Sequence, residues 1–264
     1  MSLISLPNPL VFDNKSTSEA SLVLEPLFPG YGTTVGNLLR RVLISSLHGV
    51  AVSAVKIEGV DHEFSAVEYI KEDVTKIIRN IKQLRLKART EITEPLTMTL
   101  SITGEKEVKG SDVDTPSELE VVNPDQLIAT LTDTAANLEM TFKVEPGIGY
   151  VGVDDHENKD GDIGWINIDS IFTPIINVGM EISNVRVGEM TNYEKLVLEI
   201  QTDNSRTPEE AVNEALDIVL EQINFLRNKG DQDITNSNNE SQDTESTENE
   251  VDSLSENNNI SESE

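Results

Sequence analysis

The stretch EPLFPGYGTTVGNLLRRVLISSLHG, at residues 25–49, decides the fold. It predicts a Gly/Pro turn, a Thr cap, a helix of about three to four turns and a Gly stop. Apolar residues at helical spacing form one face of this helix: Val35, Leu38, Leu39, Val42, Leu43 and Leu47. The opposite face carries Asn37, Arg41, Ile44 and His48. An Arg beside an exposed Ile indicates a second partner, unless Arg41 is simply solvated and Ile44 is covered by its own domain.

The composition limits the classes of function. The 264 residues allow one large domain or two modest ones. The net charge is −28, and residues 230–264 hold eleven acidic residues and no cation, which leaves −17 for residues 1–229. General DNA binding needs clustered cations, and a base-stacking platform needs aromatic residues, which are scarce here at 4%. The chain is therefore not expected to bind nucleic acid directly.

The cysteine count and the hydropathy pattern indicate a compartment. The absence of cysteine excludes disulfides and cysteine-ligated zinc, and it fits a reducing environment. No charged-then-apolar leader opens the sequence, and no run of about 18 apolar residues occurs in it. We expect a cytoplasmic protein without a membrane segment.

Alternating apolar and polar residues predict most of the strands. The alternation is clear in residues 96–102 and 138–145, and it indicates antiparallel strands with one face open to water. Short apolar runs predict further strands at 10–12, 21–24, 50–60, 185–188 and 193–200. Together with the helices, these strands predict an α+β fold.

Two further helices are expected. Residues 66–86 carry an apolar stripe at helical spacing. They overlap the one basic stretch of the chain, Lys71 to Arg89, which holds seven of the 20 cations. The last helix begins with a capping box at Thr207 and Glu210, with Pro208 at its first position. Its apolar residues then step by four and three, as a helix–helix seam does: Val212, Leu216, Val219, Ile223 and Leu226. This seam fits a second subunit, or else the 34–48 helix of the same chain.

No set of residues predicts an active site. The glycines at 30–36 lack the spacing of a dinucleotide fingerprint and the Lys-Ser/Thr of a P-loop. The acidic loop at 154–162 lacks Asp at the first and Glu at the twelfth position of a calcium loop. The three histidines have no metal spacing. We expect no catalytic residue, no cofactor and no metal.

The stretch at 24–47 closely resembles the signature of the N-terminal region of the bacterial RNA polymerase alpha subunit. Segments around residues 72–84, 122–131, 149–150, 165–176 and 185–200 resemble the same family. Arg79 departs from it, since the family has an apolar residue there, and Asn192 and Glu194 are conservative departures. The likeness covers roughly residues 7–228. It implies a discontinuous dimerisation domain at 1–49 and 169–229, built from an antiparallel sheet and two long helices. A mostly-β second domain would be inserted at 50–168.

Beyond the likeness, residues 230–264 are an acidic tail with too few apolar residues to fold. The family's C-terminal DNA-binding domain is not recognisable here; either this lineage lacks it or the sequence is truncated. DNA would be reached only indirectly, through the complex.

The resemblance also implies partners and site residues. The chain would form a homodimer that binds the beta and beta-prime subunits as a non-catalytic part of the nucleotidyltransferase. Arg41, Ile44 and Asn37 would contact beta, and Lys82, Arg186 and Lys195 are weaker candidates for contacts to either large subunit. The dimer core would combine residues of the first and last helices: Leu38, Leu39, Val42, Leu43, Val212, Leu216, Val219, Ile223 and Leu226.

Two other classes of function stay open. A free-standing acidic dimer could mimic nucleic acid and bind a basic protein, and such binding should weaken steeply with salt. A small-molecule enzyme is disfavoured, because no catalytic set is found.

Overall fold

A computed structural model describes residues 4–90, 92–155 and 164–243, with side chains up to Arg227. Residues up to Leu216 form one compact unit, and a second unit begins at Asp217. Each unit is described by itself.

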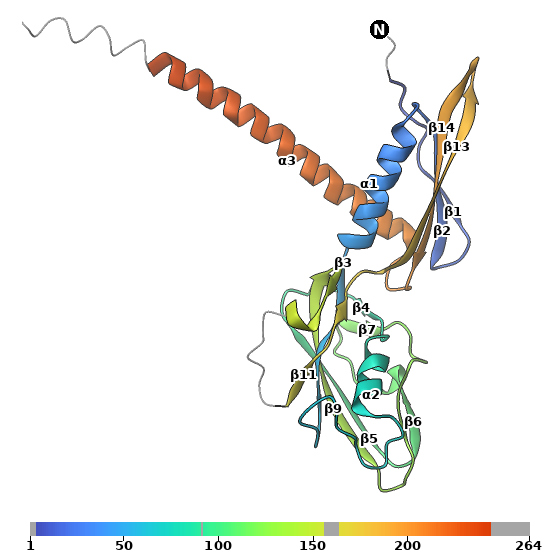
Figure 1. Cartoon of the computed structure of the whole chain (residues 1–264), viewed down its shortest axis with the longest axis vertical. Coiled ribbons are helices and arrows are strands. Elements are labelled where there is room, and N and C mark those ends of the chain that lie inside the picture. Colours follow the sequence, from blue (N-terminus) through green and yellow to red (C-terminus); the bar gives the residue numbers. More distant parts are fainter. Residues whose placement is uncertain (1–3, 91, 156–163, 244–264) are drawn as a thin grey trace, which may run out of the picture. The chain divides into compact units, whose positions relative to one another are not determined.

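The first sheet joins the two ends of the first unit (Figure 1). Its strands are antiparallel and lie in the order β1-β2-β14-β13. They span Val11–Asn14 (β1), Glu19–Leu27 (β2), Ile175–Val187 (β13) and Met190–Thr202 (β14). The strands predicted at 10–12, 21–24, 185–188 and 193–200 are confirmed, and the last two are parts of one long hairpin.

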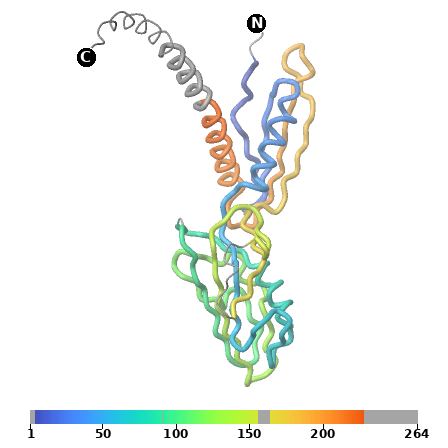
Figure 2. The backbone as a smooth tube through the Cα atoms, turned by 60° about the vertical axis from the view of Figure 1, so that its left-hand side comes forward, coloured from blue at the N-terminus to red at the C-terminus, as the bar shows by residue number. Residues whose placement is uncertain are grey.

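Helix α1, Tyr31–Ser45, lies along β13 and β14 (Figure 2). Its buried residues are Gly32, Gly36, Leu39 and Leu43. Gly36 allows close packing, because an added Cβ would lie 2.7 Å from Met180 Sδ and 2.9 Å from Leu196 Cδ1. The buried side of α1 therefore holds the helix on its own sheet.

The start of α1 differs from the prediction. The predicted Thr cap is wrong: the helix begins at Tyr31, and Gly30 precedes it in a left-handed conformation with φ 87°. The Glu194 carboxylate accepts hydrogen bonds from the backbone N–H groups of Gly30 and Gly32, both at 2.8 Å. A residue of β14 thus supplies the acceptor that a local Ser or Thr usually supplies at a helix N-terminus.

The second sheet has the antiparallel order β11-β3-β9-β5. These strands span His48–Ile57 (β3), Leu96–Thr103 (β5), Asn137–Ile148 (β9) and Trp165–Asn167 (β11). Three small pairs accompany it: β4 (Leu86–Ala88) with β7 (Leu119–Val121), β6 (Lys106–Lys109) with β8 (Leu127–Leu131), and β10 (Tyr150–Val151) with β12 (Ser170–Ile171). One continuous apolar core lies within this region, and it includes the fully buried Phe142, Met98 and Ile77.

The helix predicted at 66–86 is much shorter. Helix α2 spans only Val74–Ile81, and the Asp73 carboxylate accepts a hydrogen bond from Lys76 N at its start. Before it, Tyr69 has a left-handed φ of 63°, and Lys71 N donates to Thr130 O. Residues 66–73 are not helical, because their backbone turns at Tyr69 and pairs with the β8 region.

The chain passes from the first sheet to the second at the beginning of β3 and returns at residues 168–172, and these two passages are in contact. Ile168 N donates to Ser53 O at 2.9 Å, and Ser170 Oγ donates to Val52 O at 2.9 Å. At Gly49, an added Cβ would overlap the carbonyl oxygen of Phe172. The beginning of β3 and residues 168–172 are therefore packed backbone against backbone.

Helix α3 spans Pro208–Asp243. Its predicted capping box is confirmed: Thr207 N donates to Glu210 Oε2 at 2.9 Å, and Glu210 N donates to Thr207 Oγ1 at 3.3 Å. The helix includes residues 230–243, which the sequence assigns to the unfolded tail, and residues 244–264 lie outside the described part. The α+β class with antiparallel sheets is confirmed.

Candidate functional site

The outer side of α1 carries the three residues expected to contact a large partner. Asn37, Arg41 and Ile44 are all exposed, and Ile44 is 42% exposed. The Arg41 guanidinium has no hydrogen bond or ion pair with any residue that the structure describes. The preceding Arg40 differs, since its Nε donates to Val178 O at 3.1 Å and so helps to anchor the helix. Arg41 is thus presented to solvent from a helix fixed on its sheet.

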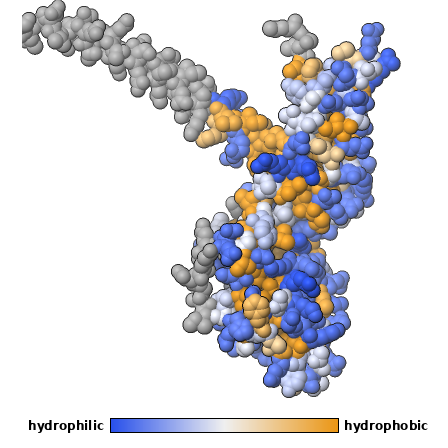
Figure 3. All heavy atoms as spheres, viewed as in Figure 1, coloured by the Kyte–Doolittle hydropathy of each residue, from blue (hydrophilic) through white to orange (hydrophobic). Residues whose placement is uncertain are grey.

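The residues expected in a dimer core fall into two groups. Leu39, Leu43 and Val212 are fully covered within the chain itself. The others remain accessible: Leu38, Ile223 and Leu226 are exposed, and Val42, Leu216 and Val219 are half-buried. The most exposed are on α3, where Ile223 is 54% and Leu226 72% exposed. Figure 3 shows apolar residues along the described part of α3.

The weaker candidates for contacts are engaged within the chain. Lys82 Nζ lies 2.5 Å from Asp169 Oδ2, and Lys195 Nζ lies 3.2 Å from Glu25 Oε2. Arg186 is exposed at the tip of the β13–β14 hairpin, where its Nε donates to Gly188 O. We expect Lys82 to contribute to the stability of the fold rather than to a partner contact, because its ammonium group already has a carboxylate partner.

The Lys82–Asp169 pair predicts a pH dependence of stability. The Lys82 ammonium, helped by the Val153 N–H, holds the pKa of Asp169 below its usual value. A carboxyl with a lowered folded-state pKa stabilises the fold above its unfolded-state pKa of about 3.9, and this contribution is lost as the pH falls through the folded-state pKa. We expect Asp169→Asn to lower the free energy of unfolding by about 1 kcal/mol at pH 7. The difference from wild type should shrink in urea titrations below about pH 4. Asp61→Asn, at an exposed carboxylate, is the control; a loss that is independent of pH would contradict the role of this ion pair.

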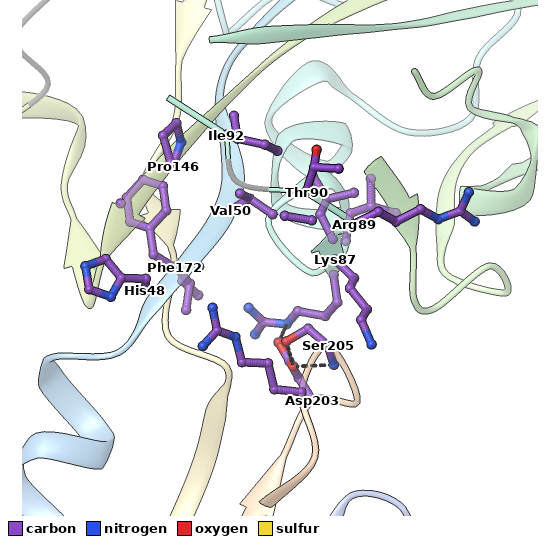
Figure 4. A pocket seen from close by; sticks show the side chains of 18 of the residues that line it. His48, Val50, Lys87, Arg89, Thr90, Ile92, Pro146, Phe172, Asp203 and Ser205 are labelled. Atoms are coloured by element: carbon purple, nitrogen blue, oxygen red, sulfur yellow. Dashed lines mark hydrogen bonds and ion pairs between the residues drawn. The ribbon is translucent and has the colours of Figure 1, made fainter. Parts of the chain in front are cut away.

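A second feature of the first unit is a cavity of about 650 Å³. Its walls come from the start of β3, the β4 region, the end of β9, residues 171–172 and the loop between β14 and α3. Figure 4 shows Val50, Ile92, Pro146 and Phe172 around one end and Lys87, Asp203 and Ser205 at the other. This cavity joins segments that are far apart in the sequence.

Glu214, at the edge of this region, connects three segments. Its Oε1 accepts from His48 N at 3.1 Å and lies 2.9 Å from His48 Nδ1, and its other oxygen pairs with the Arg206 guanidinium. Sequence reasoning missed both Glu214 and Glu194. Neither residue stands out from its sequence neighbours. The backbone groups that donate to these two carboxylates lie about 160 residues away in the sequence.

Two further observations concern metals and membranes. In the described ranges, no three His, Asp or Glu side chains are close enough together to hold a metal ion. Most of the acidic loop at 154–162 lies outside the described residues. Among the helices that the structure describes, none is long and apolar enough to cross a bilayer.

Comparison with known proteins gives consistent matches. The family model described as "RNA polymerase Rpb3/RpoA insert domain" matches residues 55–173. The DNA-directed RNA polymerase subunit alpha of Aquifex aeolicus is 43% identical over 222 residues, which are 84% of this chain and 69% of that protein. The subunit of the same name in Oceanobacillus iheyensis is 45% identical over 81% of this chain and 67% of the relative. That of Desulfitobacterium hafniense is 48% identical over 79% and 65%. The chain thus spans about two thirds of the length of these relatives.

Proposed function

This chain belongs to the DNA-directed RNA polymerase alpha-subunit family, and we propose that it is the homodimeric scaffold on which the beta and beta-prime subunits assemble for transcription. In this proposal residues 1–49 with 169–229 form the dimerisation domain, and residues 50–168 form the inserted domain. The chain carries no active site of its own and reaches DNA only through the complex. It works in the cytoplasm.

The observation that supports the beta contact best is the division of α1 into two sides. One side is fixed to the sheet by Gly36, Leu39 and Leu43. The other presents Arg41 beside Ile44, a cation with free donors next to an apolar side chain. Arg is enriched among residues that dominate binding energy, because its fork pairs with carboxylate or carbonyl oxygens. Because the helix is already fixed on its sheet, binding at Arg41 needs ordering of the side chain but not of the backbone.

The dimer has its support in α3. Its seam residues continue past the last covered position, Val212, to the exposed Ile223 and Leu226. A long helix with an exposed apolar stripe needs another helix to cover it. A second copy of the chain would provide a self-complementary surface.

We expect Arg41→Ala to weaken binding of purified beta subunit by about thirtyfold, which corresponds to about 2 kcal/mol, typical of a dominant interface residue. The dimer mass in light scattering should stay unchanged. Arg79→Ala is the matched control, since Arg79 is an exposed Arg on α2 without an ion pair to a described residue.

A tagged wild-type chain recovered from its own cells should retain two very large polypeptides, and the Arg41→Ala chain should retain less of them. If Arg41→Ala is monomeric, or binds beta as Arg79→Ala does, the assignment of the α1 face is wrong. If the wild type retains no large partner, the acidic-mimic alternative takes its place.

A further inference from the structure

The cavity of the first unit has the size of a small-molecule site. Its volume of about 650 Å³ lies within the range of about 300–1,000 Å³ that small-ligand sites occupy. Its lining comes from at least four separate segments, including His48–Val50, Leu84–Thr90 and the loop residues Asp203, Ser205 and Arg206. Nothing in the role of an assembly scaffold requires a hollow at this place.

The cavity has two chemically different ends (Figure 4). Val50, Ile92, Pro146 and Phe172 provide an apolar end, and Phe172 is held there by its contact with Gly147, where an added Cβ would lie 2.7 Å from the ring. The polar end lies at Lys87, Asp203 and Ser205. A ligand that fills both ends would need an apolar body and a polar head.

The charge of the lining is opposite to that of the chain. Among the described residues of the lining there are four cations, Arg85, Lys87, Arg89 and Arg206, and two carboxylates, Asp203 and Glu210. The whole chain has 20 cations against 48 acidic residues. Arg89 and Arg206 pair with Glu120 and Glu214 outside the lining, so the positive charge available to a ligand lies at Lys87 and Arg85.

Both carboxylates already have donors. Asp203 Oδ1 accepts from Ser205 N at 2.9 Å and from Ser205 Oγ at 2.5 Å, and Asp203 Oδ2 lies 3.8 Å from Arg85 Nε. Glu210 accepts from Thr207 N. This bond chiefly holds the pKa of Glu210 below its usual value, with a smaller contribution from the nearby Lys87 and Arg206.

The cations of the lining keep more unused hydrogen-bonding groups than the carboxylates do. The Lys87 ammonium group has no hydrogen bond or ion pair with any residue in the described part of the chain, so its three donors are available. The terminal nitrogens of Arg85 likewise have no described partner, and only its Nε lies near Asp203. Arg89 contributes less, because it pairs with Glu120 at 3.3 Å and points away from the cavity in Figure 4.

We propose that this cavity binds a small organic phosphate, with the phosphate at Lys87 and Arg85 and the apolar body between Ile92 and Phe172. A phosphate group has several acceptor oxygens, which match a guanidinium fork and an ammonium group together. The apolar end contributes by burying the body of the ligand, which inorganic phosphate lacks. This site uses neither Arg41 and Ile44 of α1 nor the apolar seam of α3.

The test is calorimetric titration of the full chain with phenyl phosphate as the probe. We expect saturable binding with one site per chain and at least tenfold weaker binding of inorganic phosphate. Lys87→Ala should weaken phenyl phosphate binding at least tenfold, because it removes a charge-assisted hydrogen bond. Lys76→Ala, at an exposed lysine of α2 that does not line the cavity, should bind as the wild type does. Ile92→Ala should reduce the affinity for phenyl phosphate but not for inorganic phosphate.

Three results would overturn the proposal. One is the absence of saturable phenyl phosphate binding to wild-type chain. The second is an equal effect of Lys87→Ala and Lys76→Ala. The third is tighter, Lys87-dependent binding of a pentaglutamate peptide, which would assign the cavity to an acidic protein segment. Melting temperatures of the variants separate lost binding from lost folding, and the dimer mass and beta binding report separately on the scaffold role.

Discussion

Ile223→Asp combined with Leu226→Asp is expected to convert the proposed homodimer to a monomer. Each copy would place two carboxylates on the exposed seam of α3, where a second copy is proposed to pack. Burial of a large aliphatic side chain contributes about 1.5–3 kcal/mol, and the symmetric interface contains each position twice. The dimer dissociation constant should therefore rise by a factor of about a thousand or more, equivalent to at least about 4 kcal/mol. Light scattering over a dilution series measures this change.

The matched control is Gln222→Asp combined with Asn224→Asp. It adds the same two charges to the same turns of α3, at exposed polar positions beside the seam. This control should remain dimeric, with at most a small change in its dissociation constant. Monomers from both double variants would indicate that charge alone disrupts α3. A persistent dimer in the seam variant would mean that another surface joins the two copies.

Gly49→Ala is expected to be strongly destabilising. The added methyl group would overlap the backbone carbonyl of Phe172, which cannot turn aside as a flexible side chain can. We expect a loss of about 3 kcal/mol, at the upper end of ordinary overpacking costs. In a chain of this size that loss corresponds to a fall in melting temperature of about 6–12 °C.

Gly152→Ala controls for the substitution itself. An added Cβ at Gly152 has no neighbour closer than 3.6 Å, and this glycine does not have a left-handed φ. Its melting temperature should stay within a few degrees of wild type. Equal melting temperatures for the two variants would show that the two passages can separate at little cost.

Local patterns in the sequence predicted those helices and strands that are determined by residues close together in the chain. The face of α1 that carries Arg41 and Ile44 follows from a 3.6-residue period, and the start of α3 follows from Thr207 and Glu210 three residues apart. The long strands β5 and β9 follow from their alternation. In each case the residues that determine the element lie within a few positions of one another.

The features that escaped prediction depend on contacts between distant residues. Glu194 replaces a local cap at the start of α1 from about 160 residues away. The stripe at 66–86 has helical spacing, yet Tyr69 turns the backbone and Lys71 pairs with Thr130 instead. The basic stretch was visible in the sequence, but the cavity at Lys87 exists only because the loop at Asp203 returns to it.

The contact between the two passages, at Gly49 and Phe172, affects how the chain can tolerate changes in length. For the sheet that holds α1, everything between these passages is a loop whose ends are already in contact. The entropic contribution to the free energy of closing a flexible loop rises only slowly, by about 0.6 kcal/mol for each doubling of the loop length. Insertions or deletions in the enclosed stretch should therefore disturb the α1 sheet little, provided that Lys82 and Arg85 keep their contacts with Asp169 and Asp203. The tolerance ends at the junction itself, where the space between the two backbones leaves no room for a methyl group.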